Sequence, residues 1–517
     1  MSPLVLIAAT ILVRLAVIGH PFAANNESTA CAPLLSVARN YVRYGPGAVR
    51  LGGIMNSGRV LPENWSIYAN HPPLVPLSIA AVQGVAGVSE WTARAVPVFF
   101  SVASTALLYL IVGRRFGARA GIVAGFLYAF CPLTLVFGGM PDYVGAPLVF
   151  FGLAATESYV RWTETGERRW VVGLVVSFLL GALSDWPVFF LLPLFAVHQV
   201  SRPPRRLLGA LCAVAAATLL LGGLGWWAEW VSRGHGDWTS AGGDFSFLDQ
   251  FARRTLGGLD DGGNRITLGR WVGRVVVEHE GVLHTWPVLV LAAVYIVQTG
   301  RRAARREWAV LRTHLAPLLL LSWGTLHLTV GIQGNFQHPW WSVLLTPGLA
   351  AAAALAIESL VAAAPENIRG RGLGVALAAG TAAVFVASSG FAAYRYSTEF
   401  GNREETGYTL KALGAAIQSI AADDEGVLTS EMNPEPALWF YADRQLRPTI
   451  RSVEDLDRSL TRGRYDLPYG YIQRDGPAPR WFVMPAPHRM KLAPLAAALD
   501  ARFPHRAVDG FTVYQLR

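Results

Sequence analysis

The stretch that decides the topology of this chain is 68-YANHPPLVPLSIAAVQGVAGVSEW-91, which is apolar enough to cross a membrane but begins with His71 and two prolines. Pro72 and Pro73 lack a backbone donor and favour an extended entry, and Pro76 suits the first turn of a short helix. The stretch either spans the bilayer or lies on its surface. That choice sets the side of the membrane on which every later loop falls.

The composition is that of a polytopic membrane protein. Of the 517 residues, 52 % are hydrophobic and only 15 % are charged, and several runs exceed the ~18 apolar residues that indicate a spanning helix. A first run over residues 3–19 contains Arg14 and no convincing cleavage site, so we predict an uncleaved helix rather than a signal peptide. Further spans are predicted at 92–112, 121–138, 143–160, 170–184, 186–200, 207–230, 283–299, 315–332, 342–363 and 373–394.

The distribution of arginine favours a surface position for residues 73–89. If they do not cross and the N-terminus is cytoplasmic, five loops face the cytoplasm, namely GRRFGAR, RWTETGERR, SRPPRR, GRRAARREW and NIRGRG. This is the asymmetry of the positive-inside rule, and a crossing at 73–89 would reverse it. We therefore predict about eleven transmembrane helices with interfacial helices in the first outer loop. The same clusters explain the net charge of +9 without a nucleic-acid partner.

From about residue 396 the pattern changes to that of a small α/β domain. Helical periodicity and short β-rich runs alternate, in GYTLKALGAAIQSIAADD (407–424), GVLTSE (426–431), RWFVMPA (480–486), KLAPLAAALDARF (491–503) and GFTVYQLR (510–517). We predict a transmembrane domain over residues 1–395 and an extracytoplasmic α/β domain over 396–517.

Three carboxylates stand at predicted outer ends of the bundle: Glu27 in NNESTAC, Asp142 in GGMPDYVG and Asp185 in LSDWP. Charge near the bilayer is costly unless it is used. The alternative is that these acids are solvated caps, Asp185 being a natural N-cap before Trp186. Three carboxylates that close the same side of one bundle favour a common cavity.

The outer loops also carry arginines against the usual inside bias, at Arg39, Arg43, Arg50, Arg59 and Arg94. The guanidinium fork pairs with phosphate oxygens, so an anionic lipid phosphate is the expected partner. Interfacial snorkelling is the alternative for any one of them.

Histidines occur in two further outer segments. VVVEHEGVLHTWP contains Glu278, His279, Glu280 and His284, and NFQHPWW contains His338 beside Trp340. The spacing is loose for a zinc site, so ordinary polar contacts are favoured and a divalent metal is left open. Nothing matches a P-loop, a dinucleotide fingerprint or a nucleophile elbow, so we expect no nucleotide cofactor. We assign four residues to the substrate cavity: His71, Asp185, His338 and Trp340.

Several phrases resemble glycosyltransferase family 39 in order and at matching distances. They are ARNYVRYG in the first loop, HPPLVPL, the run GVSEWTARAVPVFFSVASTALLYLIVGRRFGARAGIVAGFLYAFCPL, and the loop acid in MPDYVG. This family contains GT-C fold enzymes related to protein O-mannosyltransferases and to the lipid A aminoarabinose transferase. The resemblance covers roughly residues 1–200, and beyond them it is one of topology alone.

The resemblance implies a GT-C fold and a glycosyltransferase on the outer side of a bacterial cytoplasmic membrane. Such an enzyme takes a sugar from a polyprenyl phosphate and places it on a glycan, lipid or protein acceptor, usually with inversion. One carboxylate accepts the acceptor's proton and cations hold the leaving phosphate. Glu27 and Asp142 are therefore the catalytic candidates, and the donor-phosphate candidates are Arg94, Arg39 and Arg50.

One departure from the family concerns the first-loop acid, which usually stands nine residues before the Arg of an Ala-Arg pair. Counted from Arg39 that position is Ala30, and Glu27 lies three residues earlier. Either the loop is longer here or the base is elsewhere. The rival functions are a multi-span transporter, which commonly shows inverted repeats and broken midplane helices, and a non-catalytic sugar-lipid binding or assembly protein, which the displaced acid would fit.

Overall fold

The computed structural model divides into two compact units. The first, here the helical unit, comprises Met1–Gly19, Arg94–Gly225 and Gln250–Ser397, and the second, here the mixed unit, comprises His20–Ala93, Trp226–Asp249 and Thr398–Arg517. The structure describes residues 2–517 apart from 23–25, 63–64, 69–70, 201–219, 221, 228–229, 232–257, 261–262, 364–382, 384, 392–393, 395–408, 432–435, 448, 462–464, 467–471 and 474–477. The predicted spans at 207–230 and 373–394 lie largely outside the described residues.

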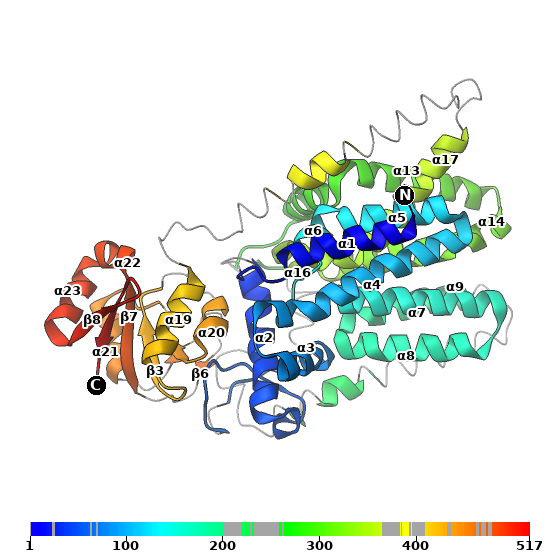
Figure 1. Ribbon diagram of the computed structural model, residues 1–517. Coiled ribbons are helices and arrows are strands. Elements are labelled where there is room, and N and C mark those ends of the chain that lie inside the picture. Colours follow the sequence, from blue (N-terminus) through cyan, green and yellow to red (C-terminus); the bar gives the residue numbers. More distant parts are fainter. Residues whose placement is uncertain are drawn as a thin grey trace. The chain divides into compact units, whose positions relative to one another are not determined.

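The helical unit is a bundle of apolar helices. In chain order they are α1 (Pro3–Val17), α4 (Glu90–Phe116), α5 (Ala118–Phe130), α6 (Pro132–Phe137), α7 (Ala146–Thr165), α8 (Arg168–Ser184), η3 (Trp186–Phe190), α9 (Leu191–Val200), α12 (Leu268–Trp271), η5 (Val272–Thr285), α13 (Trp286–Ala304), α14 (Trp308–Thr313), α15 (Leu315–Val330), α16 (Ile332–Gln337), η6 (Pro339–Leu344) and α17 (Thr346–Ala363). Helix α7 lies along α8 (Figure 1). Helix α17 packs against α5, α13 and α15.

Three helical segments of the described chain are long and apolar enough to cross a membrane: Glu90–Phe116, Leu268–Ala304 and Thr346–Ala363. Helix α4 has 27 residues, which gives it a length of about 40 Å against a hydrocarbon core of about 30 Å. Glu90 in its first turn and Arg114 in its last turn complement the helix dipole. The total of about eleven spans stays a prediction.

The span predicted over 121–138 is interrupted, which corrects the expectation of one continuous helix. Pro132 has no N–H to continue the helix, so α5 ends at Phe130 and α6 begins after Cys131. Arg14 of α1 compensates for the break, because its guanidinium donates to the carbonyl oxygens of Ala129 at 3.1 Å and Leu135 at 3.3 Å. An arginine inside an apolar helix is thereby used within the protein rather than exposed to lipid.

Close helix contacts in the helical unit depend on glycine. A Cβ on Gly324 of α15 would lie 2.2 Å from the Cα of Leu345, and a Cβ on Gly348 of α17 would lie 2.5 Å from the backbone nitrogen of Leu321. Each glycine thus faces backbone of the partner segment, so any larger residue would force the helices apart. Small residues allow this close approach in membrane bundles.

The mixed unit contains a five-stranded sheet in the order β4-β3-β7-β9-β8. Its strands are β3 (Gly426–Thr429), β4 (Gln445–Arg447), β7 (Pro479–Pro485), β8 (His505–Val508) and β9 (Phe511–Gln515). Strand β3 is parallel to β4 and β7, and β9 is antiparallel to β7 and β8. A second short pair joins β5 (Tyr465–Asp466) and β6 (Ile472–Gln473).

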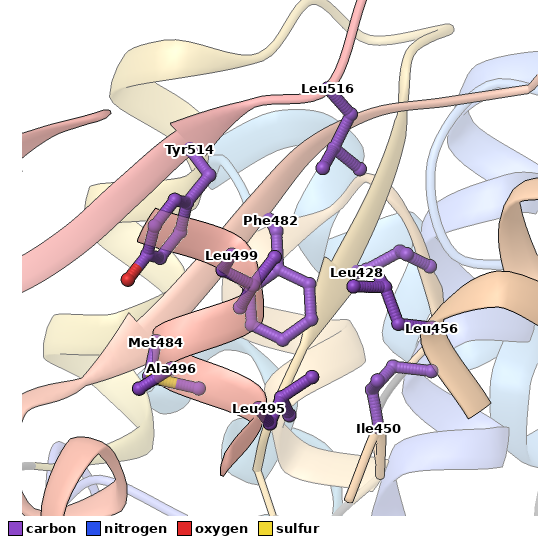
Figure 2. Packing of buried hydrophobic residues seen from close by; sticks show 10 residues of the cluster. All are labelled: Leu428, Ile450, Leu456, Phe482, Met484, Leu495, Ala496, Leu499, Tyr514 and Leu516. Atoms are coloured by element: carbon purple, nitrogen blue, oxygen red, sulfur yellow. The ribbon is translucent and has the colours of Figure 1, made fainter. Parts of the chain in front are cut away.

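Helices and the five-stranded sheet enclose an apolar core in this unit (Figure 2). The C-terminal segment 396–517, here called the tail, contains the helices α19 (Leu410–Ile420), α20 (Pro436–Ala442), α21 (Val453–Thr461), α22 (Ala486–Lys491) and α23 (Ala493–Arg502). Phe482 and Met484 of β7, two residues apart, pack with Leu495 and Leu499 of α23, as the alternation of a strand and the period of a helix require. Every residue of β3 is buried, which is typical of a central parallel strand.

The first loop packs with the tail in the mixed unit. It contains α2 (Asn26–Tyr44), η1 (Pro46–Val49), the pair β1 (Gly53–Ile54) and β2 (Ile67–Tyr68), and α3 (Leu74–Ala86). The 13 residues of α3 give a length of about 20 Å, too short for a bilayer core, which favours the surface position predicted for 73–89. Residues 20–93 of the first loop and residues 398–517 belong to one compact unit. The division of the chain into two domains at 395/396 stays a prediction.

Candidate active site

Asp142 lies in the loop between α6 and α7 and is 8 % exposed. Its Oδ1 accepts a hydrogen bond from the backbone nitrogen of Tyr143 at 2.7 Å, and its Oδ2 accepts one from Nε1 of Trp340 at 2.6 Å. Bonds from N–H donors to an ionised carboxylate are short and strong. The carboxylate is therefore held in one orientation by both of its oxygens.

Trp340 reaches Asp142 because the chain breaks between α16 and η6. His338 has an extended conformation, with φ −115° and ψ 93°, and η6 then begins at Pro339. Proline suits this first position because an N–H there would have no hydrogen-bond acceptor within the helix. The Trp340 ring centroid lies 5.9 Å from that of Phe137 and 4.8 Å from that of His338. The structure thus brings together three residues predicted for the site: Asp142, His338 and Trp340.

A π-helix, η5, precedes α13 and contains a buried acid–histidine pair. Nδ1 of His284 lies 2.6 Å from Oε2 of Glu280, and Nε2 of His284 lies 2.9 Å from Oγ1 of Thr346. Thr285, where η5 meets α13, has a positive φ of 67°, which is uncommon for a β-branched residue. π-Helical turns are rare and frequently occur at functional sites.

The three metal candidates occupy this helix but differ in their surroundings. Glu278 is exposed, whereas His279 and His284 are buried, and His284 contacts Glu280 and Thr346. Within the described ranges, no group of three or more His, Cys, Asp or Glu side chains is placed to hold a metal ion. A divalent metal at Glu278, His279 and His284 stays a prediction.

Two of the predicted donor-phosphate ligands, Arg94 and Arg50, donate hydrogen bonds to backbone carbonyls of residues distant in the sequence. Arg94 of α4 is 5 % exposed and donates through Nη1 to the carbonyl of Ile18 at 3.3 Å. Arg50, in the mixed unit, donates to the carbonyl of Trp230 at 3.0 Å and lies over its ring at 4.5 Å. Phosphate binding by either residue stays a prediction.

The third, Arg39, forms an ion pair with the tail. Its Nη1 lies 3.0 Å from Oδ1 of Asp443, whose Oδ2 is 2.6 Å from Nη2 of Arg43. Burial alone would raise the pKa of the Asp443 carboxyl, but the charges of Arg39 and Arg43 outweigh it and hold that pKa below its usual value. Both arginines of this helix are thereby engaged by an acid within the protein.

The remaining predicted residues are placed as follows. Asp185 is fully buried and caps η3, because its Oδ1 accepts from the Trp186 nitrogen at 2.8 Å, so the N-cap interpretation is confirmed. His71 lies at a bend before α3, and Glu27 lies in the first turn of α2, its side chain outside the described residues. Glu27 and His71 belong to the mixed unit, whereas Asp142, Asp185, His338 and Trp340 belong to the helical unit. A cavity shared by these six residues stays a prediction.

Three polar residues around α16 were not predicted from the sequence. Oε1 of Gln333 and Oδ1 of Asn335 are buried and have no hydrogen-bond partner among the described residues, and the Asn335 amide nitrogen is held by the carbonyls of His327 and Gly331. Arg274 lies over the ring of Phe336 at 4.8 Å. The signal for the two amides was present in the sequence, because Gln333, Asn335 and Gln337 alternate within the short segment 333–337 that follows an apolar run.

The fold has counterparts in known proteins. The structure matches ArnT from Cupriavidus metallidurans bound to undecaprenyl phosphate, with a TM-score of 0.61 and 14 % identity, over 99 % of this chain and 97 % of that one. It also matches the archaeal oligosaccharyltransferase AglB from Archaeoglobus fulgidus, in complex with an inhibitory peptide and a dolichol-phosphate. That match has a TM-score of 0.55 and 11 % identity, over 99 % of this chain and 74 % of AglB.

These likenesses define the class, since the chain has the GT-C fold of membrane glycosyltransferases. Residues 70–226, which include Asp142, match the family model described as dolichyl-phosphate-mannose-protein mannosyltransferase. The resemblance to glycosyltransferase family 39 is thereby confirmed. No curated protein sequence matches the chain.

Proposed function

We propose that this chain transfers a sugar from a polyprenyl-phosphate donor to a glycan, lipid or protein acceptor, with inversion, on the outer face of a bacterial cytoplasmic membrane. The observation that carries the proposal is the Asp142 carboxylate. It is buried, fixed by Trp340 and Tyr143, and lies inside the residues that match the mannosyltransferase family. A buried acid so held is costly in a membrane protein unless it serves a function.

The reaction needs two kinds of group. The acceptor hydroxyl gives its proton to a carboxylate while its oxygen attacks the anomeric carbon, and the bond from that carbon to the phosphate oxygen breaks. The electron pair leaves with the polyprenyl phosphate, whose charge cations stabilise. We assign the base to Glu27 by its position in the chain, as the first-loop acid before the Ala-Arg pair. Asp142, whose oxygens each accept one hydrogen bond, is assigned the orientation of a substrate.

The leaving phosphate is assigned to arginine. Arg94 remains the first candidate, and Arg274 is added because its guanidinium, over Phe336, has no ion-pair partner among the described residues. The unpartnered acceptors of Gln333 and Asn335 suit the hydroxyl groups of a sugar, since a buried carbonyl oxygen without a donor is unfavourable.

Of the two rival functions, the transporter lacks such support. A transporter would place its substrate site at broken midplane helices of repeated halves, whereas the polar residues named here collect near loops and a π-helix. A non-catalytic sugar-lipid binding protein would need the same lipid contacts but no base. Only an activity measurement separates it from an enzyme.

The test uses the purified chain with polyprenyl-phosphate sugars and a panel of glycan, lipid and protein acceptors, with release of polyprenyl phosphate as the readout. Glu27→Gln removes the charge and keeps the shape, and should lower turnover by about 10²-fold or more. Asp142→Asn should mainly raise the apparent KM. Wild-type turnover in both variants would refute the assignment, and binding of donor without any transfer would favour the non-catalytic protein.

A further inference from the structure

Helix α2, which carries Glu27 in its first turn, is attached to the tail through two arginines. Arg39 and Arg43 are four residues apart and therefore lie on the same face of the helix. Both reach the carboxylate of Asp443, Arg39 at 3.0 Å and Arg43 at 2.6 Å. The side chains are 12 %, 14 % and 19 % exposed for Arg39, Arg43 and Asp443, so the pair is shielded from water more than a surface salt bridge.

Asp443 is placed for this contact by its backbone. It directly follows α20 and has a positive φ of 44°, a conformation in which aspartate is enriched among non-glycine residues. Its Oδ1 also accepts from the backbone nitrogen of Gly58 at 3.3 Å. A Cβ on Gly58 would lie 2.7 Å from the backbone of Arg444, so the turn after α20 and the chain after α2 are in direct contact.

Three residues of α20 hold the first loop at further points. The Phe440 carbonyl accepts from Nη2 of Arg39 at 2.7 Å, and its ring lies 4.8 Å from the guanidinium. The Tyr441 hydroxyl accepts from the backbone nitrogen of Phe22 at 2.6 Å, and the Trp439 carbonyl accepts from Ser57 at 3.0 Å. One short helix of the tail thus contacts the first loop before, along and after α2.

The position of Glu27 depends on both ends of this attachment. Arg39 lies about 18 Å along the helix from Glu27 at a rise of ~1.5 Å per residue, so a tilt of about 10° would move Glu27 by roughly 3 Å. Pro33 lies between them and removes one helical hydrogen bond. The helix alone therefore does not fix its first turn. Tyr441 also holds the backbone of Phe22, four residues before the start of α2.

We infer that Asp443 is a positioning residue, which acts through Arg39 and Arg43 to hold the Glu27 end of α2 in its catalytic position. The inference rests on the proposed role of Glu27 as base. It gives the tail a part in the reaction without placing any tail residue on the substrate. A displacement of ~1 Å at a reacting group can cost about 10²-fold in rate.

The test compares Asp443→Asn with Asp457→Asn in the full-length enzyme. Asp457 pairs with Arg502 at 2.7 Å in an exposed bridge of the same tail, so its variant controls for loss of a tail charge. Asp443→Asn should lower kcat by about 10-fold to 100-fold with little change in the KM for the donor. Asp457→Asn should leave both unchanged.

A double variant separates positioning from general damage. If Asp443 acts through Glu27, Glu27→Gln/Asp443→Asn should turn over no more slowly than Glu27→Gln alone. Multiplied losses would overturn the inference, as would wild-type kcat in Asp443→Asn. If Asp443→Asn does not fold, Arg43→Lys replaces it, because lysine keeps the positive charge but lacks the two-pronged guanidinium. This variant should show a smaller loss of kcat than Asp443→Asn would. An unchanged kcat in Arg43→Lys also overturns the inference. Wild-type turnover in Glu27→Gln refutes the proposed function instead.

Discussion

Replacing Trp340 by phenylalanine tests whether one hydrogen bond orients Asp142. The change removes the Nε1–H donor that lies 2.6 Å from Oδ2 of Asp142 and keeps an aromatic ring near Phe137 and His338. A hydrogen bond to a charged group contributes about 1.5–3 kcal/mol. Because both partners are buried, no water replaces the donor freely, and kcat/KM should fall by roughly 10-fold to 150-fold.

The loss of indole volume needs its own control. Trp341, the next residue, is also buried, and its ring lies beside His327 and His338, so Trp341→Phe removes the same volume nearby. Each tryptophan variant is combined with Asp142→Asn, and polyprenyl phosphate release is followed under single-turnover conditions. A coupling energy above about 1 kcal/mol is expected for Trp340 and near zero for Trp341. Equal coupling for both pairs, or none for Trp340, would refute the reasoning.

Three further predictions concern the donor, the topology and the pH dependence. Arg94→Ala should weaken donor use by about 2–4 kcal/mol if a charged contact to phosphate is lost; unchanged turnover and donor affinity would assign Arg94 to its contact with the chain. With the native cysteines replaced by serine, single cysteines at Asn70, Gly139 and Arg506 should all react with an impermeant reagent from outside, and protection of 139 alone would contradict the topology. The lowered pKa of Asp443 means that its contribution to stability is present above about pH 4 and lost as pH falls through the folded value. Hydrogen exchange of α2 should therefore accelerate on acidification, and Asp443→Asn should abolish that dependence.

Local patterns in the sequence predicted much of the tail and the bundle correctly. The runs at 426–431, 480–486 and 510–517 became β3, β7 and β9, because alternation and β-branched residues determine a strand locally. The strands β4 (QLR) and β8 (HRAV) escaped prediction, since both contain charged or polar residues and lack a run of β-branched or aromatic residues. The cap at Asp185 was also readable, because Asp is a preferred N-cap residue and Pro187 suits the first turn that follows.

The candidate site shows where local patterns end. Asp142 was identified as a loop acid, and Trp340 as a cavity residue, but their hydrogen bond joins positions 198 residues apart. The attachment of Arg39 to Asp443 joins positions even farther apart in the chain, and the sequence favoured a lipid phosphate as the partner of that arginine. An arginine's side chain has the same preference for a carboxylate as for a phosphate, so sequence does not distinguish the two.

The sequence by itself determined the membrane class, the family resemblance and the spacing of apolar helices, because hydropathy, arginine bias and turn residues act over a few tens of residues. Only the tertiary structure decided that Arg14 closes the break at Pro132, that the tail packs with the first loop in one unit, and which donors hold Asp142. Those outcomes depend on which buried polar groups form hydrogen bonds or ion pairs after folding. The packing of segments far apart in the sequence decides these partners, and residues adjacent in the chain do not.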